Sequence, residues 1–150
     1  MAIVESELIC HRGATLFAPE NTLSPLDKTA EFGGSWIDTD VRLTLDGELV
    51  MIHDDTLDRT TNGSGFVSLH SLSEIQALDA GSWFKPEFTG ECVPKMSEYI
   101  ECVLDHGLGL QLELKSMFGQ EERLASAVIK QIKPYLSALK HKFYFSSFSL

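Results

Sequence analysis

The strongest constraint on the fold comes from the stretch between positions 36 and 61, WIDTDVRLTLDGELVMIHDDTLDRTT. Its first part alternates with the period of a β-strand, with Ile37, Thr39, Val41 and Leu43 on one side and Asp38, Asp40 and Arg42 on the other. A turn signal at Asp46-Gly47 and a short apolar run follow, and the run ends at His53. Two carboxylates on one strand face suit a hard divalent cation with oxygen ligands. The alternative is that Asp38 and Asp40 line a solvated face of the sheet.

Composition restricts the class of partner. The chain has 150 residues, enough for one domain with a proper core, and its 43% hydrophobic and 23% charged residues are typical of a globular protein. A formal net charge of −10 argues against a nucleic-acid backbone or an anionic membrane surface as the main partner. A small phosphate ester remains compatible with this charge, because a metal ion and a few local cations can offset the field.

The cysteines and the N-terminus bear on the compartment. Cys10, Cys92 and Cys102 do not have the spacing of a zinc site, so reduced thiols are the simplest interpretation. The first ten residues are acidic rather than basic and do not resemble a signal peptide. No apolar stretch approaches the ~20 residues of a membrane span. We therefore expect a cytoplasmic protein with no integral membrane segment.

Strand and helix signals alternate along the chain. Strands are predicted near residues 7–11, 36–42, 109–115 and 142–146. Helices are predicted from a cap at Asn21 or Thr22 to Gly33, around 74–78 after a cap at Ser71 or Ser73, over 95–106, and over 121–139 with a kink or end at Pro134. This order predicts an α/β fold with a parallel sheet and helices outside. The irregular segment 79–94 carries Trp83, Phe84 and Phe88, which we expect to form a lid or to cover a core edge.

Polar side chains stand at or near the ends of the predicted strands, namely His11 with Arg12, Asp38 with Asp40, His53, and Glu113 with Lys115. In parallel α/β folds, ligands bind at the carboxyl ends of the strands. Carboxylates that hold a metal, cations that bind phosphate and histidines that exchange protons suit phosphoryl chemistry. The alternatives are a surface ion pair between Glu113 and Lys115 on an edge strand, and histidines with structural roles.

Several motifs occur in a specific order over essentially the whole chain. They are His11-Arg12-Gly13, Pro19-Glu20-Asn21-Thr22, Thr44-x-Asp46-Gly47, His53-Asp54, Leu57-x-Arg59-Thr60-Thr61-Asn62-Gly63, Asp79-Ala80-Gly81-Ser82-Trp83 and Glu113-Leu114-Lys115. With them the chain resembles the glycerophosphodiester phosphodiesterase family, of the cytoplasmic bacterial type.

The resemblance implies a fold and an activity. The fold is a TIM (β/α)₈ barrel of the phosphodiesterase type, with a small insertion after the second strand at about residues 60–94. The activity is hydrolysis of a small-molecule glycerophosphodiester to glycerol 3-phosphate and an alcohol, with a divalent cation, Mg²⁺ or Ca²⁺. Residues carried over from the family are His11 and His53 as general acid and base, Asp38, Asp40 and Glu113 as metal ligands, and Arg12 and Lys115 as groups that contact phosphate or metal-site oxygens.

Two departures from the family pattern stand out. The first metal carboxylate of the family is usually Glu, whereas this chain has the shorter Asp38. A (β/α)₈ barrel takes ~250 residues, so residues 1–150 are expected to form its N-terminal half and the natural protein to continue beyond Leu150. A half-barrel alone exposes a sheet edge and apolar surface, which predicts a homo-oligomer or aggregation.

Two other functions stay open from the sequence. One is a non-catalytic phosphodiester-binding barrel or inactive fragment, although binding alone does not need two proton-transfer groups such as His11 and His53. The other is a related phospholipase D-like or phosphoinositide-cleaving enzyme on a similar barrel, against which the segment from Asp79 to Trp83 and the absence of a secretion signal weigh.

Overall fold

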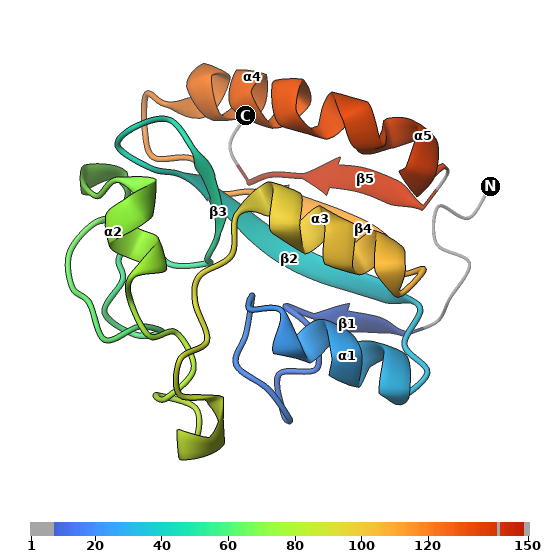
Figure 1. The fold of residues 1–150 in the computed structure, drawn as a ribbon. Helices are drawn as coiled ribbons and strands as arrows, with labels where there is room; N and C mark the ends of the chain where they lie inside the picture. The colour runs from blue at the N-terminus through green and yellow to red at the C-terminus, as the bar shows by residue number, and fades with distance from the viewer. Residues whose placement is uncertain (1–7, 141, 149–150) are drawn as a thin grey trace.

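The computed structural model describes residues 8–140 and 142–148 and shows a sheet covered by helices (Figure 1). The strands are β1 (Ile9–His11), β2 (Trp36–Leu43), β3 (Leu49–Met51), β4 (Gly109–Leu114) and β5 (Phe143–Ser146). The α-helices are α1 (Ser24–Glu31), α2 (Leu72–Gln76), α3 (Met96–Asp105), α4 (Glu121–Ile132) and α5 (Leu136–Leu139). Short 3₁₀ turns lie at η1 (Val67–Leu69), η2 (Pro86–Phe88) and η3 (Lys133–Tyr135).

Four strands form the parallel part of the sheet in the order β1-β2-β4-β5, as the alternation of strand and helix signals predicts. The first predicted strand is observed from Ile9, and residue 7 lies outside the described residues. The sequence prediction missed β3, which pairs with β2 in antiparallel fashion after the Asp46-Gly47 turn. Because β4 pairs with one edge of β2 along most of its length, β1 and β3 share the other edge.

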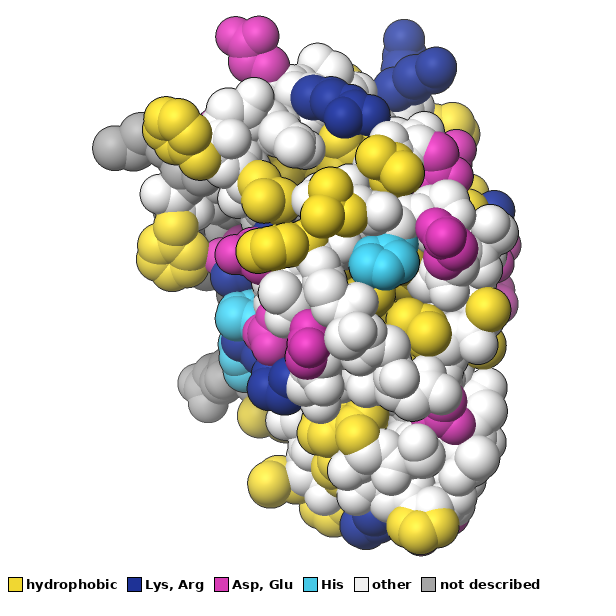
Figure 2. Space-filling view, turned by 90° about the vertical axis from the view of Figure 1, so that its left-hand side faces the viewer, with side chains coloured by type: hydrophobic (Ala, Val, Ile, Leu, Met, Phe, Trp, Pro, Cys, Tyr) yellow, Lys and Arg dark blue, Asp and Glu magenta, His cyan; other side chains and the backbone are white. Residues whose placement is uncertain are grey.

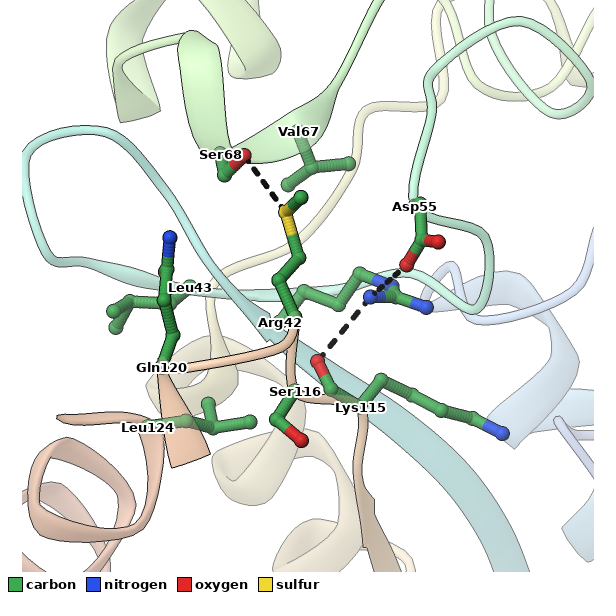
Figure 3. A pocket seen from close by; sticks show the side chains of 10 residues that line it. Arg42, Leu43, Asp55, Val67, Ser68, Lys115, Ser116, Gln120 and Leu124 are labelled. Atoms are coloured by element: carbon green, nitrogen blue, oxygen red, sulfur yellow. Dashed lines mark hydrogen bonds and ion pairs between the residues drawn. The ribbon is translucent and has the colours of Figure 1, made fainter. Parts of the chain in front are cut away.

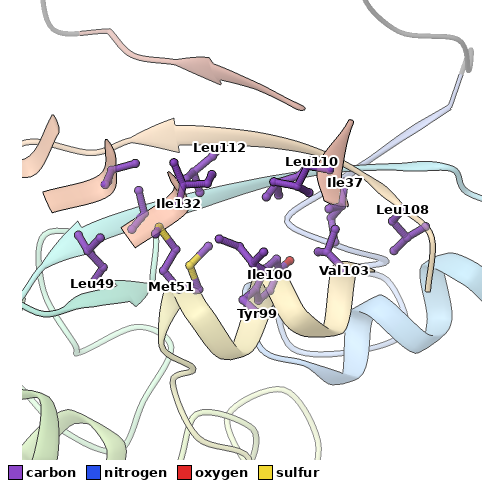
Figure 4. Close-up of a cluster of buried hydrophobic side chains, with 14 of the residues drawn as sticks. Ile37, Leu49, Met51, Tyr99, Ile100, Val103, Leu108, Leu110, Leu112 and Ile132 are labelled. Carbon is purple, nitrogen blue, oxygen red and sulfur yellow. The ribbon is translucent and has the colours of Figure 1, made fainter. Parts of the chain in front are cut away.

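The main core lies between the sheet and its helices (Figure 4). Helix α3 contributes its apolar stripe, and the sheet contributes the apolar face that alternates with Asp38 and Asp40. Fully buried members of this core include Leu26, Ile37, Val41, Tyr99, Ile100, Val103, Leu110, Leu112 and Val128. One face of the sheet is therefore apolar and covered, and the opposite face is free to carry polar groups.

The structure corrects one predicted helix cap and confirms another. Helix α1 begins at Ser24 after Leu23 and has no side-chain cap, because the Asn21 side chain donates to Asp40 instead. Ser71, one of the two predicted caps of α2, is confirmed, because it forms a capping box with Glu74. The helix begins directly after it at Leu72, two residues earlier than predicted. As predicted, the chain leaves the α-helical path at Pro134, where α4 gives way to a 3₁₀ turn.

The segment that we predict to be an insertion packs around a second, smaller core together with β3, formed by Val50, Ile52, Leu57, Val67, Ile75, Ala80 and Val93. Asp79 organises its irregular part, since the carboxylate accepts hydrogen bonds from the backbone amides of Gly81, Ser82 and Gly90. These bonds lower the pKa of Asp79 well below its usual value. Trp83, Phe84 and Phe88 pack edge to face on one another rather than into either core.

Candidate active site

The register of the sheet brings the predicted site residues to one face. His11 lies beside Asp38, and Asp40 lies beside Glu113, so these side chains project to the same side, opposite the helices. Figure 2 views the molecule from the side on which the strands end, and histidine, acidic and basic side chains gather there at the left-hand edge. The carboxyl ends of the strands therefore carry the cluster, as ligand sites in parallel α/β folds do.

The two histidines approach each other along one edge of β2. Strand β1 runs parallel to β2 and ends at His11, level with Asp38. Strand β3 runs the opposite way, and the amide of Ile52 donates to the carbonyl of Asp40 just before His53. Two strands that share an edge and run in opposite directions point their ends at each other, so His11 and His53 flank the two aspartates.

Each histidine is oriented by a carboxylate. The Nδ1 atom of His11 lies 2.6 Å from Asp38 Oδ2, and the Nδ1 atom of His53 lies 2.7 Å from Asp54 Oδ1. An ionised carboxylate accepts hydrogen bonds and cannot donate one, so both histidines carry a hydrogen on Nδ1 and direct Nε2 away from the carboxylate. With the His11 side chain 64% exposed, its Nε2 is accessible to a substrate. This is the geometry of a group ready to exchange a proton at Nε2.

The backbone after β1 is held in an unusual conformation. Arg12 has φ of +53° and Gly13 has φ of +93°, both in the left-handed region. The amide of Arg12 donates to the carbonyl of Asp38, which fixes the turn against β2. Strain of this kind persists only where the surroundings determine it, and it typically occurs at functional sites.

The acidic groups of the cluster are already surrounded by cations. The Asp40 carboxylate is buried and meets Arg12 Nε at 3.3 Å, Lys115 Nζ at 3.5 Å and the Asn21 amide nitrogen at 3.0 Å. Glu113 Oε1 lies 2.5 Å from Lys115 Nζ. This ion pair makes Lys115 a bridge between two of the three predicted metal ligands.

Donor type and position fit a hard cation only in part. In the described part of the chain, no three His, Cys, Asp or Glu side chains form a ready-made metal cluster. Asp38, Asp40 and Glu113 nevertheless share one sheet face, and Asp38 Oδ1 is a buried carboxylate oxygen without a hydrogen-bond partner. An oxygen in that state is costly to bury and suits a cation. A bound cation would have to displace the ammonium group of Lys115 from between the other two.

A network of ion pairs connects the His53 side of the site with the Arg12 side. Asp54 accepts from Arg59 Nε at 2.6 Å and from a terminal nitrogen of the same guanidinium at 2.9 Å. Glu20 accepts from both terminal nitrogens of Arg59, at 2.9 and 2.7 Å, and Arg12 reaches Glu20 at 3.0 Å. His53 is thereby connected to Arg12 through Asp54, Arg59 and Glu20.

The ion pairs among Asp54, Arg59 and Glu20 shift the pKa values of these three groups. The hydrogen bonds of Arg59 lower the pKa of Asp54, against the opposing effect of burial and with help from His53. Burial raises the pKa of Glu20, but Arg59 and Arg12 outweigh it, so the pKa is lowered overall. Glu20 and Asp54 in turn raise the pKa of Arg59. All three groups are therefore ionised at neutral pH.

The sequence assigned no site role to Glu20, Asp54 or Arg59, and it marked Asn21 only as a possible helix cap, although each belongs to a motif quoted above. Asn21 donates to Asp40 and accepts from Thr39 at 2.8 Å, with φ of +57°. Asn is among the few residues that tolerate this conformation. The residue type at position 21 is therefore a local signal that the sequence could have offered. The partners of Glu20 and Arg59 give no such signal, because they are brought together only by the fold.

The comparisons identify the family of the chain. Residues 11–150 match the model of the glycerophosphoryl diester phosphodiesterase family. A glycerophosphodiester phosphodiesterase of Caldanaerobacter subterraneus is 43% identical over 128 residues, which cover 85% of this chain and 53% of that protein. One of Bacillus subtilis is 37% identical over 133 residues, which cover 81% of this chain and 45% of that protein.

Solved structures show the same architecture. An Oleispira antarctica phosphodiesterase in complex with the product sn-glycerol-3-phosphate matches with a TM-score of 0.88 and 40% identity, covering 96% of this chain and 58% of that one. The predicted α/β class is confirmed, and the chain corresponds to roughly half of the TIM-barrel neighbours, in keeping with an N-terminal half. The chain spans about half the length of the curated relatives it matches. In the part of the chain described, no helix has the length and apolarity needed to cross a bilayer.

Proposed function

Because the chain belongs to the glycerophosphoryl diester phosphodiesterase family, we propose that it serves the hydrolysis of glycerophosphodiesters to glycerol 3-phosphate and an alcohol. The observation that carries the proposal is the pair of histidines, each with Nδ1 on a carboxylate, that flank the acidic face of β2. The sn-glycerol-3-phosphate bound to the Oleispira antarctica phosphodiesterase agrees with this product.

The substrate anion needs positive charge in an otherwise acidic protein. Arg12 and Lys115 are the cations nearest to the carboxylate cluster, and both are largely buried. In this proposal they bind or orient the phosphodiester, while Asp38, Asp40 and Glu113 hold a divalent cation, Mg²⁺ or Ca²⁺. When bound, such a cation supplies Lewis-acid polarisation of a phosphoryl oxygen.

The histidines supply what the cations cannot. A phosphodiester is unreactive at neutral pH because its leaving alkoxide is basic and its anion repels nucleophiles. One group must take a proton from the attacking hydroxyl, and another must give a proton to the leaving oxygen. His11 and His53 are assigned these two roles, each through Nε2, because Nδ1 is engaged by Asp38 or Asp54.

The test is phosphorus NMR of glycerophosphocholine hydrolysis, with and without chelator. Each of His11→Ala and His53→Ala should lower kcat by roughly 10²–10⁴-fold, the usual contribution of a general acid or base. His70→Ala is the matched control, because in the described structure the His70 side chain bonds the carbonyl of Phe66 and none of the site residues, so the variant should retain turnover.

A substrate with a good leaving group separates the two roles, because loss of the general acid should then matter little. The assignment fails if neither histidine variant loses more than a few-fold with the poor leaving group. A protein that binds the phosphodiester but releases no glycerol 3-phosphate would instead be a non-catalytic binder.

A further inference from the structure

Arg42 occupies the catalytic face but has no part in the mechanism above. It alternates with Asp38 and Asp40 along β2, and the residue is only 8% exposed. Its Nε donates to the backbone carbonyl of His53 at 2.8 Å, and one terminal nitrogen donates to the backbone carbonyl of Lys115 at 3.2 Å. That nitrogen also pairs with Asp55 at 2.5 Å. Figure 3 shows the side chain lying between Asp55 and the Lys115 carbonyl.

The two carbonyls lie just beyond the ends of two different strands. Strand β3 ends at Met51, and the Ile52 amide makes a final bond to the Asp40 carbonyl. Strand β4 ends at Leu114, and the Lys115 amide makes its final bond to the Val41 carbonyl. Beyond these two backbone bonds, the guanidinium of Arg42 binds the chain on both sides of β2, at the carbonyls of His53 and Lys115.

We propose that Arg42 is a positioning residue that fixes the spacing between His53 and Lys115 by binding both of their backbone carbonyls. Its consequence for catalysis rests on the proposed function. With Arg42 in place, the His53 imidazole and the Lys115 ammonium group start from backbone points joined by one rigid planar group. Without Arg42, each side chain is attached to a loop that follows a strand, and the two loops can move independently.

The chemistry requires arginine rather than lysine. The guanidinium presents its donors in a rigid planar fork, whereas an ammonium group is a compact point charge on a flexible stem. Asp55 holds the fork from outside and keeps its charge compensated. Burial lowers the pKa of Arg42, and the charges of Asp55, Asp40 and Asp54 oppose that effect.

Amide hydrogen exchange of the whole chain tests the positioning without relying on activity. In Arg42→Lys and in Arg42→Gln, the amides of Ile52 and Lys115 should exchange about 10-fold faster. The Lys115 amide belongs to a residue whose carbonyl has lost a charged donor, and the Ile52 amide belongs to the residue just before another such residue, His53. The amide of Arg12, which bonds Asp38 on the same edge of β2 but does not contact Arg42, should not change. Arg123→Lys, on the exposed side of α4, is the matched control.

Turnover gives a second readout. In Arg42→Lys, kcat should fall by roughly 10- to 100-fold, because a misplaced His53 costs transition-state stabilisation. KM should rise by a smaller factor, because a displaced Lys115 weakens phosphodiester binding while Arg12 is unaffected. If exchange behaves as expected but the unaltered chain releases no glycerol 3-phosphate, the proposed function fails and the positioning role stands.

Wild-type protection in Arg42→Lys would overturn the proposal, because charge alone would then suffice. Equal acceleration at the Arg12 amide would also overturn it, because it would indicate general loosening. If both Arg42 variants fail to fold, the unaltered chain carries the test. The Arg42 Nε–H donates to the His53 carbonyl and should exchange far more slowly than the Nε–H of the exposed Arg123. Equal exchange rates of these two side-chain protons would refute the proposal.

Discussion

Replacing Arg59 by Gln should separate the two sides of the site. Arg59 makes two hydrogen bonds to Asp54 and two to Glu20, and these residues come from different loops. The substitution removes the positive charge and the guanidinium fork and leaves a shorter, neutral amide. Asp54 then keeps only His53, and Glu20 keeps only Arg12, as ionic partners within the described network.

The expected cost follows from the exposure of each pair. The Arg59 side chain is 44% exposed, so its ion pair with Asp54 should contribute about 1 kcal/mol, the upper end for a partly exposed pair. Glu20 is much less exposed, and losing a bidentate charged partner there should cost about 1–2 kcal/mol. The free energy of unfolding should therefore fall by about 2–3 kcal/mol in Arg59→Gln.

Urea unfolding at neutral pH measures this loss, and a double-mutant cycle with Glu20→Gln isolates the pair. The control is Lys28→Gln, which breaks the exposed pair of Lys28 with Glu31 and should leave stability nearly unchanged. A loss in Arg59→Gln no larger than in the control would refute the reasoning. So would a coupling energy near zero between Glu20 and Arg59.

The pH dependence gives an independent check. The folded-state pKa values of Glu20 and Asp54 are lowered, so the stability they contribute is fully present above their unfolded values of about 4. It is lost as the pH falls through the lowered folded values. The gap between the unaltered protein and Arg59→Gln should therefore be constant from pH 7 to about 5 and shrink below about pH 4. A gap that widens on acidification would contradict the network.

Two glycine substitutions test the backbone of the site and of the segment at 60–94. Gly13→Ala should lower the free energy of unfolding by about 3 kcal/mol, because φ is +93° and a Cβ there would lie 2.2 Å from Pro25 Cβ; thermal unfolding measures it, and a loss below about 1 kcal/mol would show that the turn relaxes. Gly81→Ala should cost about as much, because its Cβ would lie 1.9 Å from the Phe88 carbonyl oxygen; unchanged exchange of the Gly90 amide, which bonds Asp79, would show that the loop accommodates it.

Periodicity was sufficient to predict the parallel strands and the main helices. The alternation around Asp38 and Asp40 predicts a strand with one apolar and one acidic face. In the structure both aspartates lie on the polar face of β2, beside His11 and Glu113. The stripes of α3 and α4 follow the helical period and are buried as expected. These features are readable because burial acts on each element through its own side chains.

Strand β3 and the cap of α1 were not readable in that way. Leu49–Met51 is only three residues long, and all three are buried, so it lacks the alternation that marks a half-buried strand. Its direction is set by the Asp46-Gly47 turn. Asn21 is a residue type that often caps helices, but here its side-chain amide is hydrogen-bonded to Asp40 and Thr39 on β2 instead.

Burial of Asp40 explains why the pairing within the site also escapes local patterns. An ionised carboxylate with almost no exposure must be compensated, and the sequence offers several cations for the task. Which of them reach it depends on the register that sets Asp40 beside Glu113 and brings Lys115 past the end of β4, and on the left-handed turn that directs Arg12 inward. Lys115 is thus held by two carboxylates before any phosphate arrives. A phosphodiester or a cation that enters must compete for those same partners, so substrate, metal and Lys115 are coupled through Asp40 and Glu113.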